Sequence, residues 1–208
     1  MKFKNRKEAA LLLVEKLMDY KDKDAVVLAI PRGGVPIGYI IAKSLNLPLE
    51  IVLSKKIGHP FHKEYAIGAV TLKNRILSPA ANDIPDDYIE EETKKIKENL
   101  RQRFQKFCGD KEEMNLHGKI LLVVDDGVAT GNTVLSIIEM LREEKPKKIV
   151  IAIPVSPPDA FQNLQNSPFV DEVICLIVPN DFRAVGQFYE DFSEVDDEQV
   201  KDFLELAN

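Results

Sequence analysis

Short, uninterrupted apolar runs recur along the chain, and each ends in a turn or a polar loop. A strand with one face in water would alternate between apolar and polar residues, so continuous runs predict strands that are buried on both faces. Five such strands are expected, at residues 25–30, 49–53, 119–124, 148–153 and 173–178.

Amphipathic segments with helical spacing separate these runs. Helices are expected at residues 6–20, 35–46, 132–144, 157–166 and 198–206. Strands that alternate with helices predict an α/β fold, a five-stranded parallel sheet with helices on both faces. We expect one domain over residues 1–208, with a core at about 25–178, a helical insertion at about 78–117 and a small C-terminal hood at about 179–208, the termini together forming that hood.

Two parts of the chain do not follow this alternation. Residues 57–73 are irregular and then alternate weakly, as in a long loop or a hairpin. Residues 86–107 are a charged helical segment inside the insertion, and we expect this helix to lie across the outside of the core.

Composition narrows the classes of function. A chain of 208 residues with 45% hydrophobic and 30% charged residues has the balance of a globular domain, and its net charge of −6 does not suit a general nucleic-acid or anionic-membrane surface. No secretory signal and no apolar run of about 18 residues occurs. The two cysteines, Cys108 and Cys175, show no disulfide or zinc spacing. We therefore expect a cytoplasmic protein without nucleic-acid or membrane partners.

The most informative segment is residues 121–133, LLVVDDGVATGNT. A buried strand delivers Asp125 and Asp126 at its carboxyl end, where parallel sheets bind ligands. Gly127 permits a tight exit, and Ala129, Thr130, Gly131, Asn132 and Thr133 lead into a helix. Backbone N–H groups at a helix start, with the positive end of the helix dipole, can bind a phosphate.

Two carboxylates beside a phosphate site suggest a sugar phosphate as the ligand. The carboxylates would accept hydrogen bonds from vicinal ribose hydroxyls while the amides bind the 5′-phosphate, and Mg²⁺ would offset the remaining charge. A Walker B strand also ends in two acids, but no G-x-x-x-x-G-K-[ST] segment is present. A plain strand followed by a turn and a capped helix is the other alternative.

The pattern of residues 121–133 resembles the phosphoribosyl-pyrophosphate signature of type I phosphoribosyltransferases. The resemblance implies that Asp125 and Asp126 contact the ribose 2′- and 3′-hydroxyls, and that Gly127, Val128 and the loop through Thr133 hold the ribose 5-phosphate. The segments PRGGVPIG (31–38), KKIGHPFHKEYAIGAV (55–70) and VGQFYEDFSEVDDEQV (185–200) are similar to a bacterial and archaeal subgroup called predicted phosphoribosyltransferases.

The same resemblance implies a pyrophosphate site and a lid. Arg32, Gly33 and Gly34 follow the first strand and look like the family's pyrophosphate loop. A lysine after the second strand reaches the pyrophosphate in related enzymes, and the sequence does not choose between Lys55 and Lys56. Residues 58–68, bounded by glycines, occupy the place of the family's flexible lid.

Aromatic residues of the tail are candidates for binding the acceptor. Phe182, Phe188 and Tyr189 offer stacking surfaces for a base, although they equally suit packing of the hood onto the core. The family resemblance also implies Mg²⁺ bound through the pyrophosphate, with Asp125 or Asp126 reaching it through water, and a homodimer.

The predicted function is transfer of the 5-phosphoribosyl group from phosphoribosyl pyrophosphate to a nitrogenous base, with release of pyrophosphate, in nucleobase salvage. The expected catalytic residues are Asp125, Asp126, Arg32 and Lys56, which orient the ribose and stabilise the leaving group. The alternatives are a regulatory protein that binds phosphoribosyl pyrophosphate or a nucleotide without transferase activity, and hydrolysis with water as the acceptor.

Overall fold

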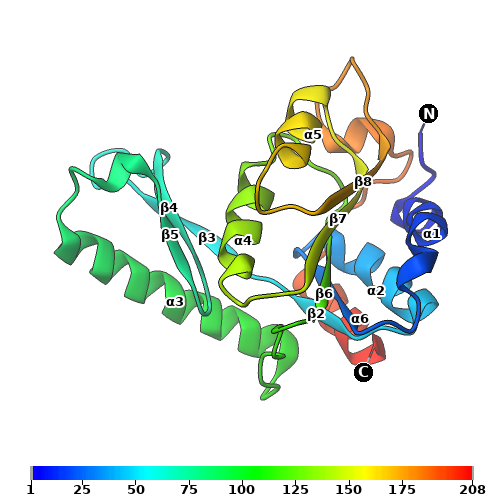
Figure 1. The fold of residues 1–208 in the computed structure, drawn as a ribbon, viewed down its shortest axis with the longest axis horizontal. Coiled ribbons are helices and arrows are strands. Elements are labelled where there is room, and N and C mark those ends of the chain that lie inside the picture. The colour runs from blue at the N-terminus through cyan, green and yellow to red at the C-terminus, as the bar shows by residue number, and fades with distance from the viewer. Residues whose placement is uncertain (1, 208) are drawn as a thin grey trace.

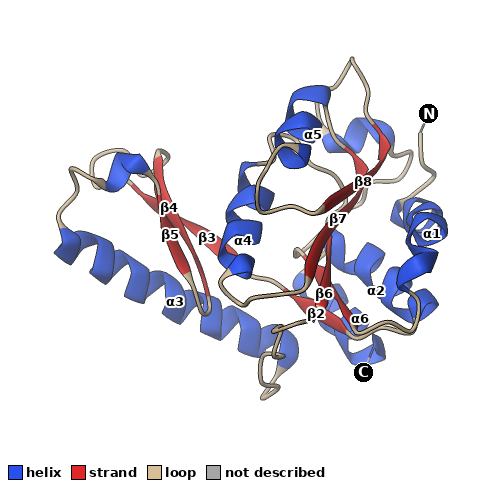
Figure 2. Ribbon diagram, viewed as in Figure 1, coloured by secondary structure: helices blue, strands red, loops and turns tan. Residues whose placement is uncertain are grey.

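The computed structural model describes residues 2–207 and contains a five-stranded, all-parallel sheet at its centre (Figures 1 and 2). The strand order is β2-β1-β6-β7-β8. These strands are β1 (Ala25–Ala29), β2 (Leu49–Ile51), β6 (Ile120–Val124), β7 (Lys148–Val155) and β8 (Glu172–Ile177). The predicted strands are thus confirmed to within a few residues at their ends.

Alternate residues of β1, β6 and β7 are buried in two separate apolar clusters, one on each face of the sheet. In β1, Val27 packs into one cluster and Val26 and Leu28 into the other. All five residues of β1 are buried. This double burial is the reason that these strands are continuous apolar runs in the sequence.

Helices cover both faces of the sheet, as predicted. The helices of the described chain are α1 (Arg6–Leu17), α2 (Gly34–Leu45), α3 (Asp86–Cys108), α4 (Asn132–Arg142), α5 (Pro158–Gln165) and α6 (Asp197–Ala207). The cluster on one face includes residues of α1, α2 and α6, and the cluster on the opposite face includes residues of α4 and α5 (Figure 1). Short 3-10 helices lie at Met18–Tyr20, Pro79–Ala81 and Val185–Phe188.

A second, three-stranded antiparallel sheet forms an arm with α3, and it projects away from the core (Figure 1). Its strands are β3 (Ser54–Gly58), β4 (Ala66–Thr71) and β5 (Arg75–Leu77). The sequence pattern indicated only a loop or hairpin here. These strands are short and include exposed polar positions, so they lack the apolar runs that mark the central strands.

The long charged helix α3 buries a single apolar stripe under its solvated face. The buried residues recur at helical spacing along α3, at Ile89, Thr93, Ile96, Leu100, Phe104 and Phe107. The helix packs along β3 and β4 and reaches α6 at its C-terminal end, so it supports the arm as well as lying outside the core. Asn74 at the base of the arm donates to Met140 O of α4 at 3.1 Å.

The C-terminal segment after β8 divides into two parts. Residues 179–196 run past the carboxyl ends of the central strands, whereas α6 packs against α2 and α3. In the described part of the chain, no helix combines the length and apolar character that a membrane span requires.

Candidate active site

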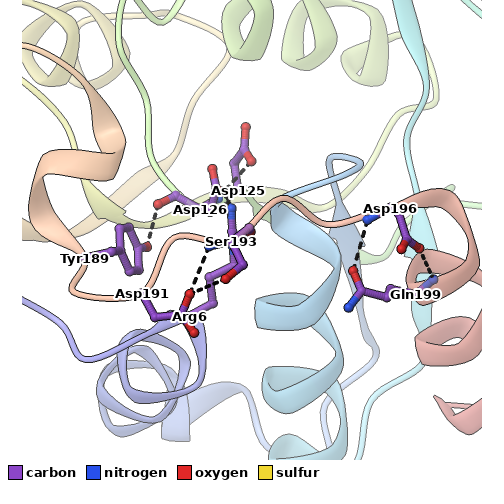
Figure 3. Close-up of polar contacts among 8 residues, drawn as sticks. All are labelled: Arg6, Asp125, Asp126, Tyr189, Asp191, Ser193, Asp196 and Gln199. Carbon is purple, nitrogen blue, oxygen red and sulfur yellow. Dashed lines mark hydrogen bonds and ion pairs between the residues drawn. The ribbon is translucent and has the colours of Figure 1, made fainter.

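The carboxyl end of β6 places two adjacent carboxylates in a largely buried position. Asp125 Oδ1 accepts a hydrogen bond from Asp126 N at 2.8 Å, and Tyr189 Oη donates to Asp126 O at 2.6 Å (Figure 3). The chain then leaves through Gly127, whose φ is 158° and where a Cβ would lie 2.5 Å from Val185 Cγ1. Close packing at this turn therefore requires glycine.

Burial dominates the electrostatics of this pair. It raises the pKa of Asp125 well above its usual range, and the neighbouring charge of Asp126 adds to that effect. Burial also raises the pKa of Asp126, but hydrogen bonds and charge from Arg6 oppose the shift. Burial, followed by the charge of Asp126, raises the pKa of the Tyr189 hydroxyl, which remains a hydrogen-bond donor.

Arg6, at the first position of α1, binds the second of the two acids. Its Nε and Nη2 donate to Asp126 Oδ2 at 2.9 and 2.7 Å, and its Nη1 donates to Ser193 O at 2.7 Å (Figure 3). The guanidinium carbon lies 4.0 Å from the centroid of the Phe192 ring. Only 13% and 14% of the Arg6 and Asp126 side chains are exposed, so this ion pair is largely shielded from water.

Backbone pairing between the two ends of the chain holds Arg6 in place. Phe3 N donates to Phe188 O at 2.8 Å, and Glu190 N donates to Phe3 O at 2.8 Å. The rings of Phe3 and Tyr189 pack with centroids 5.3 Å apart, and Tyr189 stacks on Phe192 at 4.9 Å. The N-terminal segment and the tail thus form one layer over the carboxylate pair.

The loop from Val128 to Thr133 leads into the N-terminus of α4. Val128 anchors the loop, because its side chain is buried and its N–H donates to Val155 O at 2.9 Å. Gly131 has a φ of 81°. Within residues 2–207, no side chain caps α4, and the N–H groups of residues 129–134 have no backbone acceptor. Exposed donors therefore remain for an anion, together with the exposed residues Thr130 and Thr133.

The loop after β1 lies directly against the carboxylate pair. A Cβ on Gly33 would overlap Asp126 Oδ2, and a Cβ on Gly34 would lie 2.6 Å from Val124 O. The peptide bond between Pro31 and Arg32 is cis. Arg32 Nη2 forms an ion pair with Glu194 Oε1, and Nη1 lies 3.8 Å from Asp197 Oδ1.

Some of these residues line an open cleft at the carboxyl edge of the sheet, whereas Asp125, Gly34 and the loop from Val128 to Thr133 are outside its lining. The residues that line it are Arg6, Arg32, Gly33, Asp126, Val185, Phe192, Glu194 and Val195. The structure thus brings Arg32 and Gly33 together with Asp126, as expected from their positions after neighbouring strands.

Lys55 and Lys56 do not join this cleft. They lie on β3, in the projecting arm rather than in a loop at the sheet edge, and both are exposed. Lys56 Nζ bonds to Glu64 Oε2 at 2.7 Å and to Glu64 O at 3.0 Å. The predicted lid, residues 58–68, includes the turn between β3 and β4 at the outer part of the arm (Figure 1).

Two of the three candidate aromatic residues adopt the second of the two arrangements that the sequence left open, packing onto the core. Phe188 and Tyr189 are buried, with 7% and 3% exposure, and pack the tail onto the core. Phe182 stacks on Phe188 with centroids 5.6 Å apart. Phe192 is the aromatic residue that lines the cleft, and one face of its ring contacts Arg6.

Sequence reasoning missed Arg6, Phe192 and Glu194. A signal existed for Arg6, because a cation at the first position of a helix opposes the helix dipole and calls for an acidic partner. That partner is 120 positions away in sequence. No comparable signal marks Phe192 or Glu194, which lie in an irregular tail.

The carboxylate pair supplies oxygen donors of the kind that Mg²⁺ prefers. Asp126 already binds Arg6, and within residues 2–207 no cluster of three or more His, Cys, Asp or Glu side chains could hold a metal. The donor set therefore fits a cation held mainly by ligand phosphates and water, with the carboxylates as partners through water.

Comparison with known proteins identifies relatives of this chain. Two Mycobacterium tuberculosis proteins, from strains CDC 1551 and H37Rv, each bear the name "Putative phosphoribosyl transferase" and are 35% identical over 217 residues. The alignments cover 99% of this chain and 47% of each relative, so the chain spans about half the length of these curated relatives.

Solved structures share the fold. The crystal structure of TT1426 from Thermus thermophilus has a TM-score of 0.87 at 36% identity and covers 100% of this chain and 99% of its own. A hypothetical protein from Neisseria gonorrhoeae with bound ppGpp has a TM-score of 0.52 at 15% identity, covering 100% and 99% of the two chains, which shows the fold alone. The model of the phosphoribosyl transferase domain matches residues 4–191, and the chain therefore belongs to the phosphoribosyl transferase domain family.

Proposed function

We propose that this protein transfers the 5-phosphoribosyl group of phosphoribosyl pyrophosphate to a nitrogenous base and releases pyrophosphate, in nucleobase salvage. One observation carries the proposal: two partly buried carboxylates, Asp125 and Asp126, lie at the start of the loop that leads into the uncapped N-terminus of α4. A ligand that uses both must combine hydroxyl donors with an anion. A ribose 5-phosphate has both groups a few bonds apart.

Each part of the candidate site has a role in this reaction. Asp125 and Asp126 would accept hydrogen bonds from the ribose 2′- and 3′-hydroxyls, and the N–H groups of residues 129–133 would bind the 5′-phosphate. Arg32, Gly33 and Gly34 would hold the pyrophosphate, with the guanidinium of Arg32 as a charged donor and the glycines allowing close approach. Mg²⁺ on the pyrophosphate would neutralise the leaving group, with Asp125 or Asp126 as a partner through water.

The residues of this chain supply orientation and charge stabilisation rather than a covalent nucleophile. The position after Gly127 is Val128, which is buried and apolar, so this loop offers no general base there. Catalysis would then come from holding the ribose and the pyrophosphate in line and stabilising charge as the bond at C1 breaks.

The arm carries the two lysines that were expected to reach the pyrophosphate. Lys55 and Lys56 are outside the cleft of a single chain, so any contact with pyrophosphate would require a second copy or movement of the arm. A homodimer in the cytoplasm is accordingly part of the proposal, and sedimentation equilibrium of the purified protein tests the assembly.

Calorimetric binding of phosphoribosyl pyrophosphate with Mg²⁺ tests the site, and a pyrophosphate-release screen over purine, pyrimidine and pyridine bases tests the reaction. Binding together with release for one base would establish the transferase and name its acceptor. Binding without release for any base would favour a regulatory protein instead. Release without an added base would indicate hydrolysis, and the absence of binding would refute the site assignment.

A further inference from the structure

Arg6 occupies the point where the ribose-binding and pyrophosphate-binding parts of the cleft meet. It donates two hydrogen bonds to Asp126 Oδ2. The same oxygen lies so close to Gly33 that a Cβ there would overlap it. Arg6, Gly33 and Asp126 all line the cleft.

This arrangement poses an electrostatic problem for the proposed ligand. A carboxylate that accepts ribose hydroxyls lies against the loop that would hold a polyanion, and like charges repel most strongly where little water screens them. Asp125 beside it adds to the negative charge of the pair. The nearest cation in the described structure that contacts Asp126 is Arg6, with its Nη2 at 2.7 Å.

Several contacts fix the Arg6 guanidinium in one orientation. Asp126 binds one edge, Ser193 O accepts from Nη1, and the Phe192 ring covers one face at 4.0 Å. An ion pair exposed on the surface would be mobile and weak. The Arg6–Asp126 pair is shielded from water, and two nitrogens of the planar guanidinium donate to the same carboxylate oxygen. The two hydrogen bonds from Arg6 to the Asp126 carboxylate both end on Oδ2.

We propose that Arg6 is a positioning residue for the reaction, one that orients Asp126 and offsets its charge so that a ribose diol and a pyrophosphate can occupy adjacent parts of the cleft. The inference rests on the proposed function and extends it. Arg6 acts through Asp126, and its effect is greatest for ligands that carry the pyrophosphate group.

The test compares ligands with and without pyrophosphate in matched variants. Arg6→Gln removes the charge, Arg6→Lys retains it without the fork, and Lys7→Gln makes the same charge change at an exposed neighbour in the first turn of α1. Calorimetry with Mg²⁺ measures the affinity of each variant for phosphoribosyl pyrophosphate, inorganic pyrophosphate and ribose 5-phosphate.

Arg6→Gln is expected to weaken the binding of both pyrophosphate-bearing ligands by about 10- to 100-fold. The fold-loss in affinity for ribose 5-phosphate should be smaller by a factor of about ten or more. Arg6→Lys should recover most of the pyrophosphate affinity, and Lys7→Gln should match the wild type. Asp126→Asn provides a second test if Arg6→Gln does not fold. Without the carboxylate charge, pyrophosphate should bind at least as tightly as it does to the wild type.

Equal weakening of all three ligands by Arg6→Gln would mean that the residue only maintains structure, and would overturn the inference. Weakening by Lys7→Gln as large as that by Arg6→Gln would do the same, because it would reflect overall charge. Loss of pyrophosphate affinity in Asp126→Asn would also overturn it. If the wild type binds no phosphoribosyl pyrophosphate, the proposed function itself fails, a result visible before any variant is made.

Discussion

The contact between Gly33 and Asp126 allows a sharp test with one methyl group. Gly33 has φ −62° and ψ −30°, values that any residue adopts at a helix start. Alanine therefore fits the backbone, and the nearest atoms to its Cβ would be those of the Asp126 carboxylate, with Oδ2 overlapping and Cγ 2.5 Å away. We therefore expect the main effect of Gly33→Ala to be displacement of that carboxylate.

The magnitude follows from the bonds that the displacement disturbs. Asp126 Oδ2 accepts two charge-assisted hydrogen bonds from Arg6, and each such bond contributes about 1.5–3 kcal/mol. They share one acceptor, so their contributions do not simply add. Replacing glycine by alanine at a compatible backbone position returns about 0.4–1 kcal/mol by restricting the unfolded chain. We expect a net loss of about 1–3 kcal/mol in the free energy of unfolding.

Denaturant unfolding of four proteins tests this reasoning: the wild type, Gly33→Ala, Asp126→Ala and the double variant. Gly33→Ala should destabilise the wild type but not the Asp126→Ala background, where no carboxylate remains to clash. Gly33→Ala should also weaken phosphoribosyl pyrophosphate binding, since the displaced carboxylate would no longer face the proposed ribose site. The same destabilisation in both backgrounds, or a stable Gly33→Ala protein with unchanged affinity, would refute the account of this contact.

Three further predictions concern the same cleft. Burial raises the folded-state pKa of Asp125 above its unfolded value. Ionisation of Asp125 therefore destabilises the folded state once the pH exceeds the unfolded pKa, and this destabilisation is complete when the pH exceeds the folded pKa. Asp125→Asn should therefore raise the melting temperature at pH 7 while abolishing ligand binding, and the gain should shrink as the pH falls; a lower melting temperature at pH 7 contradicts this. Tyr189→Phe removes the 2.6 Å bond to Asp126 O and should lower the free energy of unfolding by about 1 kcal/mol in urea; an unchanged midpoint would argue against that bond. Chelation of Mg²⁺ should abolish phosphoribosyl pyrophosphate binding without changing the melting temperature of the ligand-free protein, and a lower melting temperature would indicate a metal held by the protein itself.

The central sheet was predictable because burial on both faces leaves a simple sequence pattern. Residues 25–30 and 119–124 are apolar almost without a break, and they form β1 and β6, paired in parallel. The arm was not predictable in this way. Its strands have short or mixed patterns such as SKKIG, and the sheet is completed by packing of α3 along β3 and β4, which no strand pattern indicates.

The same contrast holds within the cleft. Asp125, Asp126 and the loop to Thr133 form one contiguous segment, so their proximity follows from local geometry alone. Arg32 and Gly33 follow a neighbouring strand, and the parallel sheet brings them to the same edge. Lys55 and Lys56 were expected there for the same reason. They lie elsewhere because β2 ends at Ile51 and the chain turns into the arm at Ser54.

The parts of the cleft that escaped prediction come from the two ends of the chain, and they depend on each other. Arg6 reaches Asp126 only because Phe3 pairs with the tail at Phe188 and Glu190, and Phe192 covers Arg6 only because the same pairing places it there. These contacts span 120 to 187 positions in sequence, so no local pattern can encode them. The central sheet determines the positions of the carboxylate pair and of the N-terminus of α4. The pairing of the N-terminal segment with the tail determines which charges surround Asp126. Changes in either terminus should therefore alter affinity for pyrophosphate-bearing ligands before they alter the fold.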